Sequence, residues 1–368
     1  MPLAPQHMDI QKSDICPKML SKFPYGESYK SKKLVGTFNK KSKYILHYQA
    51  LKLYISLGLK VSKLHRVLSF NQSPFMHEYI QHIAKLRSAS QSDFEKSCLK
   101  KLANSNYGKM IEDVRKHREV KVCQNKQSFM KTISSPLFLN FKVFNENLVI
   151  CFLKKKSIFQ RSCHAIGLAI LDLSKVHMYD LYYNHIIPET SLSPISKDLS
   201  IMMSDTDSFL FTFKNKTKEQ FLKDIEHIMD FSNYPKNHKL FSLANAGQLG
   251  YLKDEMKGVS EIDAVVTLKS KCYSIKSKAA NTNKCKGIPK IATSKLQFKH
   301  YKKALFEKKI FNSKFAKITS KDHKVATTSI TRKSLTGYDD KRYYLCDIHS
   351  IPYGHYKINE GKLECLCR

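Results

Sequence analysis

The sequence predicts an α+β protein, because strand-like and helix-like segments alternate along a chain that is apolar enough to form a core. Hydrophobic residues make up 42% of its 368 residues, a length that allows two or three domains or one multi-lobed enzyme. In residues 199–213, two apolar β-like runs flank a short polar turn, which is the pattern of a hairpin. Residues 92–117 place apolar side chains at helical spacing behind a capping box from Ser92 to Glu95.

The N-terminal part of the chain is less regular. Residues 1–35 hold four prolines among polar residues and are expected to be irregular. A strand is expected at 44–48, followed by a helix that ends at Gly58. Residues 61–70 fit a strand or a helix equally well, and a helical pattern returns over 75–86.

Regular elements are also expected beyond the helix at 92–117. They are strands at 120–122, 137–139 and 148–153 and helices at 164–183, 220–229 and 296–310. The helix over 164–183 is apolar enough to be buried, and we expect it to pack under the hairpin.

The net charge of the chain points to a polyanionic partner. There are 64 Lys and Arg residues against 31 Asp and Glu, a formal charge of +33. Thirteen lysines and a single acid, Glu307, lie within residues 269–309. Nucleic acid is the first expectation, with a non-specific affinity on the order of 10⁻⁴ to 10⁻⁶ M that falls steeply with salt. An anionic membrane surface is less favoured, because neither terminus is a basic amphipathic segment.

Targeting signals are not apparent. No apolar run approaches the roughly 20 residues of a membrane span, and the opening Met1-Pro2-Leu3-Ala4-Pro5 does not resemble a signal peptide. The ten cysteines are scattered. We therefore expect a reduced, intracellular protein.

The polar turn of the hairpin carries two carboxylates, Asp205 and Asp207, between apolar strands. Acids in such a place need a stabilising partner, because burial of an unpaired charge is costly. A hard divalent cation such as Mg²⁺ would supply one, since it takes carboxylate oxygens and leaves positions for phosphate or water. The alternative is a plain acidic turn, which Asp and Ser also favour.

The helix at 92–117 carries an unusual polar stripe. Lys96, Lys100, Asn104, Tyr107 and Gly108 fall on one face at 3.6 residues per turn. A cation, an amide, a phenol and a bare backbone in register would suit a nucleotide. The alternative is an ordinary basic amphipathic helix.

These two segments carry a resemblance to family B DNA polymerases. Lys100-x₃-Asn104-Ser105-x-Tyr107-Gly108 resembles their motif B, and Asp205-Thr206-Asp207-Ser208 resembles their motif C, in the same order and at a similar separation. The chain is most similar to the protein-primed branch, and within it to the polymerases of Maverick/Polinton-type elements and related viruses. Further segments that support this resemblance are Pro2–Pro5, Ile166–Lys175, Met178–Tyr179, Lys253–Glu255, Lys269–Ser274, Lys284–Ile288, Tyr338–Tyr343 and Tyr353–His355.

The resemblance covers only the C-terminal part of such a polymerase. The exonuclease domain and motif A are missing, and no Asp-x-x-x-Tyr-Pro occurs anywhere in the sequence. Smaller departures are Met203, where an aromatic residue commonly precedes the aspartates, and Asn106 within motif B. We therefore expect a truncated gene product that is inactive alone. The competing expectation is a non-catalytic DNA-binding remnant, or one subunit of a split polymerase.

The resemblance implies deoxynucleotidyl transfer to a primer 3′-OH or a protein primer, with two Mg²⁺ ions about 3.5–4 Å apart. Asp207 would bridge both metals, Asp205 would support them, and Thr206 and Ser208 would shape the hairpin. DNA primer-template, a deoxynucleoside triphosphate and a priming protein are the implied partners.

The remaining implied roles concern nucleotide and DNA. Lys100 would neutralise charge on the incoming triphosphate. Helix spacing and charge make Lys96 and Arg87 weaker candidates for further triphosphate contacts. Asn104 and Tyr107 would check the nascent base pair, and Gly108 would let that pair approach the helix. Lys271 and Tyr273, in a Lys-x-Tyr motif, and the nearby Lys269 would hold the primer. A solvated lysine-rich surface is the alternative for this last group.

The implied fold is a right-hand polymerase with an incomplete antiparallel palm, helical fingers and a small thumb, acting in the nucleus or at viral replication sites. The expected divisions are 1–85 for a palm-proximal segment, 86–118 for fingers with motif B, 119–260 for the palm with an insertion and motif C, and 261–368 for the thumb and C-terminal region.

Two other clusters of polar residues could be sites. Tyr338-Asp339-Asp340 lacks the residue that separates Tyr from the acid pair in reverse transcriptases, and Lys341-Arg342 follows at once, so salt-bridged carboxylates are expected. A zinc site could be sought among C-terminal cysteines and histidines, but their spacings match no familiar finger, and free thiols and surface histidines are expected. These residues are Cys346, His349, His355, Cys365 and Cys367.

Overall fold

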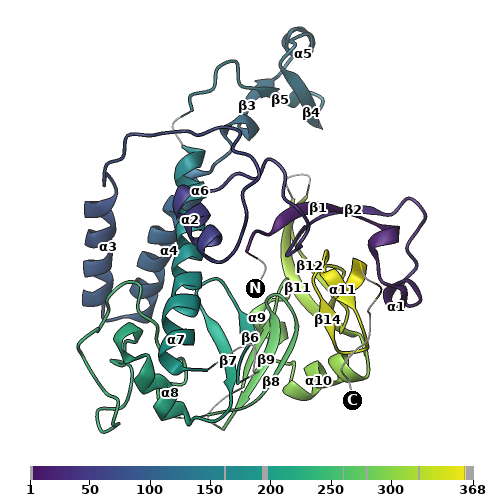
Figure 1. Ribbon diagram of the computed structural model, residues 1–368. Helices are drawn as coiled ribbons and strands as arrows, with labels where there is room; N and C mark the ends of the chain where they lie inside the picture. The colour runs from purple at the N-terminus through teal and green to yellow at the C-terminus, as the bar shows by residue number, and fades with distance from the viewer. Residues whose placement is uncertain are drawn as a thin grey trace. The chain divides into compact units, whose positions relative to one another are not determined.

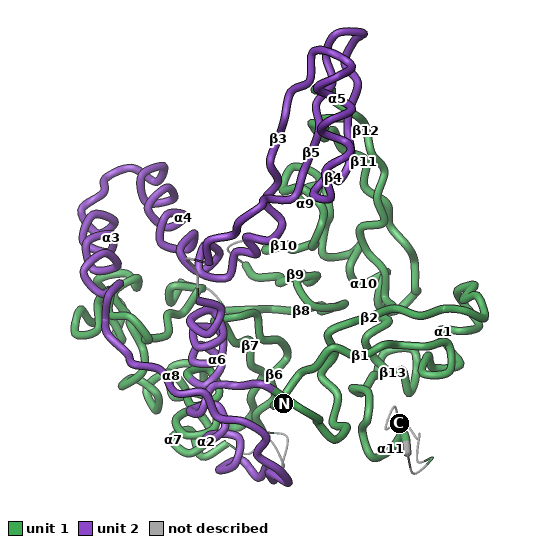
Figure 2. The backbone as a smooth tube through the Cα atoms, turned by 90° about the horizontal axis from the view of Figure 1, so that it is seen from above, with its two compact units in different colours: residues 1–44, 177–368 green, residues 45–176 purple. Residues whose placement is uncertain are grey.

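The computed structural model describes residues 3–160, 163–192, 198–259, 261–278, 281–321, 324–359 and 361. It is a mixed α+β structure with several small antiparallel sheets (Figure 1). The chain forms two compact units, residues 1–44 with 177–368 (unit 1) and residues 45–176 (unit 2), which Figure 2 shows in different colours. Each unit is described by itself. In the part of the chain described, no helix is long and apolar enough to cross a membrane.

In unit 1, the predicted hairpin is confirmed as β6 (Leu199–Ser204) and β7 (Phe209–Phe213), which pair antiparallel. Its apolar side chains pack on a π-helical turn (Leu181–Ile186) and on α8 (Lys218–Asp224). Tyr182 stacks on Phe211 with ring centroids 6.2 Å apart, and Phe213 stacks on Phe221 at 4.4 Å. Aromatic stacking of this kind adds about 0.5–1.5 kcal/mol per pair beyond area burial. These aromatic contacts fix the hairpin against the π-helical turn and α8.

A second sheet of unit 1 lies next in the sequence. β8 (Ile262–Lys269), β9 (Cys272–Ser277) and β10 (Thr282–Cys285) form an antiparallel sheet in the order β10-β9-β8. The predicted helix over 296–310 is present as α10 (Phe298–Phe306), and it buries Tyr301 and Ala304 completely. The short α9 (Lys290–Thr293) precedes it, and the long hairpin of β11 (Phe311–Lys321) and β12 (Lys324–Leu335) follows.

The expectation that residues 1–35 are irregular is wrong. β1 (Gln6–Gln11) and β2 (Lys30–Val35) pair antiparallel, with α1 (Pro17–Leu20) between them. Ile10 and Val35 are buried with aromatic side chains from the far end of the chain, Tyr344 and Tyr353. The C-terminal elements are β13 (Tyr343–Tyr344), β14 (Ser350–Ile351) and α11 (Tyr356–Asn359). The strands are stabilised by these distant partners rather than by local propensity.

Unit 2 contains a helical part and a small sheet. Its helices include α2 (Tyr48–Ser56), α3 (His77–Ala89) and α4 (Asp93–Met110), as expected from the apolar spacing. The three predicted strands are present as β3 (Arg118–Cys123), β4 (Phe138–Asn145) and β5 (Leu148–Lys154), in the order β3-β5-β4, with α5 (Lys126–Ile133) between β3 and β4.

Several expectations for unit 2 and the helices need correction. No strand forms at 44–48, because the backbone N–H of His47 donates to the Asp172 carboxylate at 2.7 Å and α2 begins at once. Residues 61–70 form neither strand nor helix. The helix at 92–117 ends at Met110, before a short 3₁₀ turn at Val114–Lys116. The 220–229 helix is split into α8 and a 3₁₀ turn (Glu226–Ile228).

The long helix at 164–183 is present as α6 (His164–Asp180) and continues as the π-helical turn. Its C-terminal end packs against the hairpin as expected, through Met178 and Tyr182. The rest is not the buried helix expected. Ile170, Leu171 and Leu173 are exposed. The apolar residues of α6 extend around more of the helix than the face that packs against other elements.

Candidate functional site

The turn between β6 and β7, Asp205-Thr206-Asp207-Ser208, is a closed and strained structure. The Asp205 N–H donates to the Ser208 carbonyl at 3.1 Å, and the Asp207 N–H donates to the Asp205 carbonyl at 2.8 Å. Thr206 adopts φ +64°, a left-handed conformation that a β-branched residue rarely takes. Such strain persists only where the surroundings impose it, and it clusters at functional sites.

The two carboxylates of this turn differ in environment. The Asp205 side chain is 23% exposed and forms an ion pair with the Lys271 ammonium. Asp207 is exposed and makes no ion pair with any described residue. One carboxylate is therefore compensated within the protein, whereas the other presents free acceptor oxygens to solvent.

Lys271 reaches Asp205 from the two-residue turn between β8 and β9. It has φ +57°, and its carbonyl accepts from the Lys286 N–H at 3.0 Å, which fixes the turn against β10. The hydrogen bond to Asp205 raises the pKa of Lys271, so the ammonium stays charged. Lys269 is exposed at the end of β8.

Tyr273 follows on β9 and is buried. Burial, together with the negative charge of Asp205, raises the pKa of its hydroxyl, which keeps it protonated at neutral pH. Unit 1 therefore brings together two motifs that are distant in sequence, the Asp-x-Asp turn and the Lys-x-Tyr segment.

The donor set of this turn suits a divalent cation that is completed by a substrate. Mg²⁺ is usually bound by one or two carboxylates plus phosphate oxygens and water. Asp207 and Asp205 match that limited set, with Asp207 the more accessible ligand. In the described part of the chain, no group of three or more His, Cys, Asp or Glu side chains could hold a metal ion. The turn alone would bind such an ion weakly.

The predicted nucleotide-binding stripe lies on α4 in unit 2. Lys96, Lys100, Asn104 and Gly108 are exposed, and Tyr107 is half-buried beside Gly167. The predicted cap is present in part, because the Ser92 hydroxyl accepts from the Glu95 N–H at 3.1 Å. The stripe therefore presents its polar groups to solvent.

Gly108 has no packing reason to be glycine. A Cβ built there would meet nothing within 4 Å, yet glycine inside a helix costs about 1 kcal/mol relative to alanine. A cavity of about 460 Å³ on the side of α4 that faces α3 is lined by Tyr79, Leu102, Ser105, Asn106, Gly108, Lys109 and Glu112. Lys100 and Asn104 do not line it, and Arg87 is exposed on α3. Apart from Gly108, the stripe thus lies outside this cavity.

Two further carboxylates, Asp230 and Asp254, were not selected from the sequence as site residues. The Asp254 oxygens accept from the Tyr234 hydroxyl at 2.7 Å, from two backbone N–H groups and from Lys218 at 2.9 Å. Burial alone would raise the Asp254 pKa, but these donors outweigh it and the pKa is lowered. Asp230 is buried and is bound by Lys253 and the N–H groups of Ser232 and Gly247. The carboxylate oxygens of both residues are therefore occupied by hydrogen-bond donors of the protein itself.

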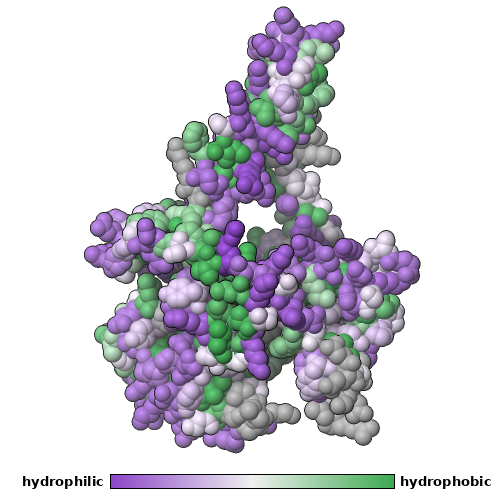
Figure 3. Space-filling model, turned by 45° about the horizontal axis from the view of Figure 1, so that its top comes forward, coloured by the Kyte–Doolittle hydropathy of each residue, from purple (hydrophilic) through white to green (hydrophobic). Residues whose placement is uncertain are grey.

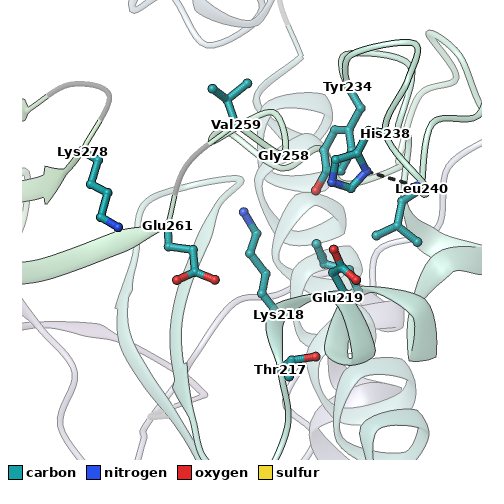
Figure 4. A pocket seen from close by; sticks show the side chains of 11 residues that line it. Thr217, Lys218, Glu219, Tyr234, His238, Leu240, Gly258, Val259, Glu261 and Lys278 are labelled. Carbon is teal, nitrogen blue, oxygen red and sulfur yellow. Dashed lines mark hydrogen bonds between the residues drawn. The ribbon is translucent and has the colours of Figure 1, made fainter.

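The pocket in Figure 4 lies over this network and has a volume of about 450 Å³. Tyr234 and His238 meet edge to face at 4.6 Å, and the His238 ring accepts from the Leu240 N–H. Lysines (Lys218, Lys278) and glutamates (Glu219, Glu261) line it together, so it favours neither anions nor cations. The acidic turn is not part of its lining.

The two alternative clusters have different outcomes. Asp340 is ion-paired with Lys33, as expected for a salt-bridged carboxylate, and Asp339 accepts from the Lys341 N–H at 3.1 Å. Cys346 contacts His349, whereas His355 stacks on Tyr356. Cys365 and Cys367 lie outside the described residues.

Comparison of the chain with protein-family models, with curated proteins and with solved structures finds no match.

Proposed function

We propose that the chain takes part in template-directed DNA synthesis, as the C-terminal portion of a family B DNA polymerase of the protein-primed branch. The observation that carries the proposal is the meeting of two separately recognised motifs in unit 1: Lys271 pairs with Asp205, and Tyr273 lies next to them. On this proposal, unit 1 supplies part of the palm and the thumb, and the helices of unit 2 supply the fingers. Such polymerases act in the nucleus or at sites of viral replication, and we place the chain there.

On this proposal, Asp207, Asp205 and the neighbouring Lys271 have different roles. Asp207 offers its oxygens to Mg²⁺, which, when bound, would favour deprotonation of the primer 3′-OH and neutralise the triphosphate. Asp205 orients the turn and contributes negative charge. Lys271 can exchange its bond to Asp205 for one to a primer phosphate, because its side chain is half exposed.

On this proposal, the stripe on α4 binds the incoming nucleotide. The ammonium groups of Lys96 and Lys100 would bind the triphosphate, and Asn104 and Tyr107 would contact the base pair. Gly108 leaves room for that pair to approach the helix backbone.

The charge of the chain fits a DNA partner, at +33 overall. The face in Figure 3 is mostly hydrophilic, with apolar side chains scattered over it. Neutralised phosphates release counterions, so binding should weaken steeply with salt.

The sequence contains no motif A strand. The proposed reaction therefore needs the first palm carboxylate from another segment or chain. Each tenfold loss of rate corresponds to about 1.4 kcal/mol, and lack of one metal ligand should cost several such factors.

Primer extension tests the proposal. The chain is incubated with primer-template, Mg²⁺ and deoxynucleoside triphosphates, alone and with a segment that supplies motif A. Extension that Asp207→Ala abolishes and Asp263→Ala, an exposed acid on β8, leaves unchanged would support the polymerase. Salt-sensitive DNA binding without extension under either condition would instead favour a DNA-binding remnant.

A further inference from the structure

Strands β9 and β10 place two cysteines directly opposite each other. In the antiparallel register of these strands, Cys272 pairs with Cys285. The next pair along the ladder is hydrogen-bonded, because the Lys286 N–H donates to the Lys271 carbonyl at 3.0 Å. Hydrogen-bonded and non-hydrogen-bonded pairs alternate in an antiparallel ladder. Cys272 and Cys285 therefore form a non-hydrogen-bonded pair, in which the Cα atoms are about 4.5 Å apart and the side chains come closest.

This arrangement suits a disulfide bond. Disulfides join Cα atoms that are about 4.4–6.8 Å apart. The two thiols already interact, with Cys272 as the hydrogen-bond donor and the Cys285 sulfur as the acceptor. Both cysteines belong to the core cluster of unit 1 that also contains the buried Tyr301. A covalent bond between the two sulfurs therefore needs little movement of the backbone.

Unit 2 contains a pair of buried cysteines that is similar in chemistry but different in geometry. The sulfurs of Cys123 and Cys151 lie 3.9 Å apart. Cys123, however, pairs with Val149 across β3 and β5, so Cys151 is its diagonal neighbour. Diagonal neighbours have Cα atoms roughly 7–8 Å apart, which is beyond the range of an unstrained disulfide. Of these two pairs, only the one in unit 1 has the register that a disulfide requires.

Cys285 is the thiol that a small oxidant in solution meets first. Its exposed fraction is 8%, whereas Cys272 is fully buried. The hydrogen bond from Cys272 and the positive charge of Lys269 outweigh burial and lower the pKa of Cys285. The same hydrogen bond, together with burial, raises the pKa of Cys272. The thiolate is the reactive form of cysteine, so Cys285 is the nucleophile and Cys272 is the thiol that resolves the intermediate.

We propose that Cys272 and Cys285 are an oxidation site, at which hydrogen peroxide forms a reversible disulfide between β9 and β10. The Cys285 thiolate attacks one peroxide oxygen and the O–O bond breaks. The leaving hydroxide takes up the proton that Cys285 released and becomes water. The Cys272 sulfur then attacks the sulfenic acid on Cys285, the S–O bond breaks, and water leaves with the Cys272 proton. Two thiols are oxidised, and one peroxide is reduced to two waters.

The disulfide changes the contacts of β10. In the reduced chain, the Cys285 thiol donates to the Ser334 carbonyl on β12 at 3.2 Å. Oxidation removes that proton and with it the hydrogen bond to β12, and it links β10 covalently to β9. Lys271 directly precedes Cys272, so the oxidation site adjoins the turn that carries Lys271. The proposal does not depend on the polymerase function, because its chemistry uses neither the acidic turn nor DNA.

Disulfide mapping of the full chain tests the proposal. The reduced chain is freed of reductant, treated with hydrogen peroxide at low protein concentration, alkylated to block free thiols, digested and analysed by mass spectrometry. Trypsin cuts after Lys276 and Lys284, so a bond between Cys272 and Cys285 joins two separate peptides. We expect this linked species at a yield about 10-fold or more above that of a bond between Cys123 and Cys151. A thiol reductant should remove it.

The parent chain supplies its own matched comparison, so this result does not depend on the folding of any variant. Absence of the bond between Cys272 and Cys285, or equal yields for the two pairs, would overturn the proposal. Cys123→Ser should leave the bond in unit 1 unchanged. Cys272→Ser should accumulate a sulfenic acid on Cys285 that a sulfenic-acid reagent traps, whereas Cys285→Ser should accumulate none on Cys272. The reverse trapping pattern would contradict the roles assigned to the two thiols.

Discussion

Unit 1 contains two groups of carboxylates that the fold treats in opposite ways. Asp230 and Asp254 are enclosed, and their oxygens are occupied by lysines, a tyrosine and backbone N–H groups. Asp205 and Asp207 lie on a strained turn, where one oxygen meets Lys271 and the Asp207 carboxylate faces solvent. Saturated acids hold loops in place, whereas acids with spare acceptor capacity can bind something else.

On the proposed function, this difference in geometry distinguishes acids that stabilise the fold from acids that could bind a ligand. Loss of an enclosed acid should damage the fold, because its donors remain buried without partners. Loss of an exposed acid should leave the fold intact and affect only binding. The predictions below test that division, from the largest expected effect to the smallest.

Asp254→Ala should lower the free energy of unfolding by about 1–3 kcal/mol, as expected when hydrogen-bond donors around a largely buried acceptor are left without a partner. The Tyr234 hydroxyl and the N–H groups of Met256 and Gly258 would lose their acceptor. Urea denaturation measures the effect. The exposed neighbour Glu255→Ala is the control and should change stability by less than about 0.5 kcal/mol. Equal, small effects would remove the distinction between the two kinds of acid.

Low pH should also lower the free energy of unfolding, because it protonates Asp254 and Asp230. The Asp254 and Asp230 pKa values are lowered in the folded state, so the stability they provide is complete above the ordinary aspartate pKa. This stabilisation is lost as the pH falls through the pKa values that the two aspartates have in the folded state. Stability measured by urea denaturation at stepped pH below about 4 should therefore drop more steeply for the parent chain than for Asp254→Asn. Parallel curves would contradict this assignment.

Thr206→Gly should raise the free energy of unfolding by about 0.5–1 kcal/mol. Glycine adopts φ +64° without strain, and the greater conformational entropy that it loses on folding offsets only part of this gain. Thr212→Gly, on the extended strand β7 of the same hairpin, should instead destabilise. Thermal unfolding compares the two. If both glycines destabilise equally, the turn is not strained.

Lys271→Ala should have the smallest effect on stability, within about 1 kcal/mol, because exposed ion pairs contribute little. It should reduce the slope of log binding constant against log salt for DNA by about 0.9, the loss of one phosphate contact. It should also strengthen Mn²⁺ binding at the turn, since Asp205 loses its competing cation. Ala in place of Lys257, an exposed lysine that also has a positive φ, is the control.

Local patterns were sufficient for the elements that local interactions stabilise. The β6–β7 hairpin and the start of α4 at Ser92 follow from alternation and from one capping hydroxyl. β1 and β2 could not be predicted, because polar residues outnumber apolar ones in both strands and the buried Tyr344 and Tyr353 are needed to cover them. The absence of a strand at 44–48 depends on Asp172, over a hundred residues away.

The same limit applies to the site. The Asp-x-Asp turn and the Lys-x-Tyr segment could each be selected from the sequence, but the ion pair between Lys271 and Asp205 depends on the packing of two hairpins. Asp230 was missed because a single buried acid among turn residues has no spacing signal. Cys346 and His349 were noted, but only the fold shows that their side chains touch.

Mn²⁺ binding followed by electron paramagnetic resonance tests the central claim most directly, because it needs neither motif A nor turnover. The parent chain should remove Mn²⁺ from solution at a site that Asp205→Asn/Asp207→Asn eliminates and that the Asp263→Ala control retains. If the double variant binds Mn²⁺ as the parent chain does, the acidic turn is not a metal site and the account is wrong.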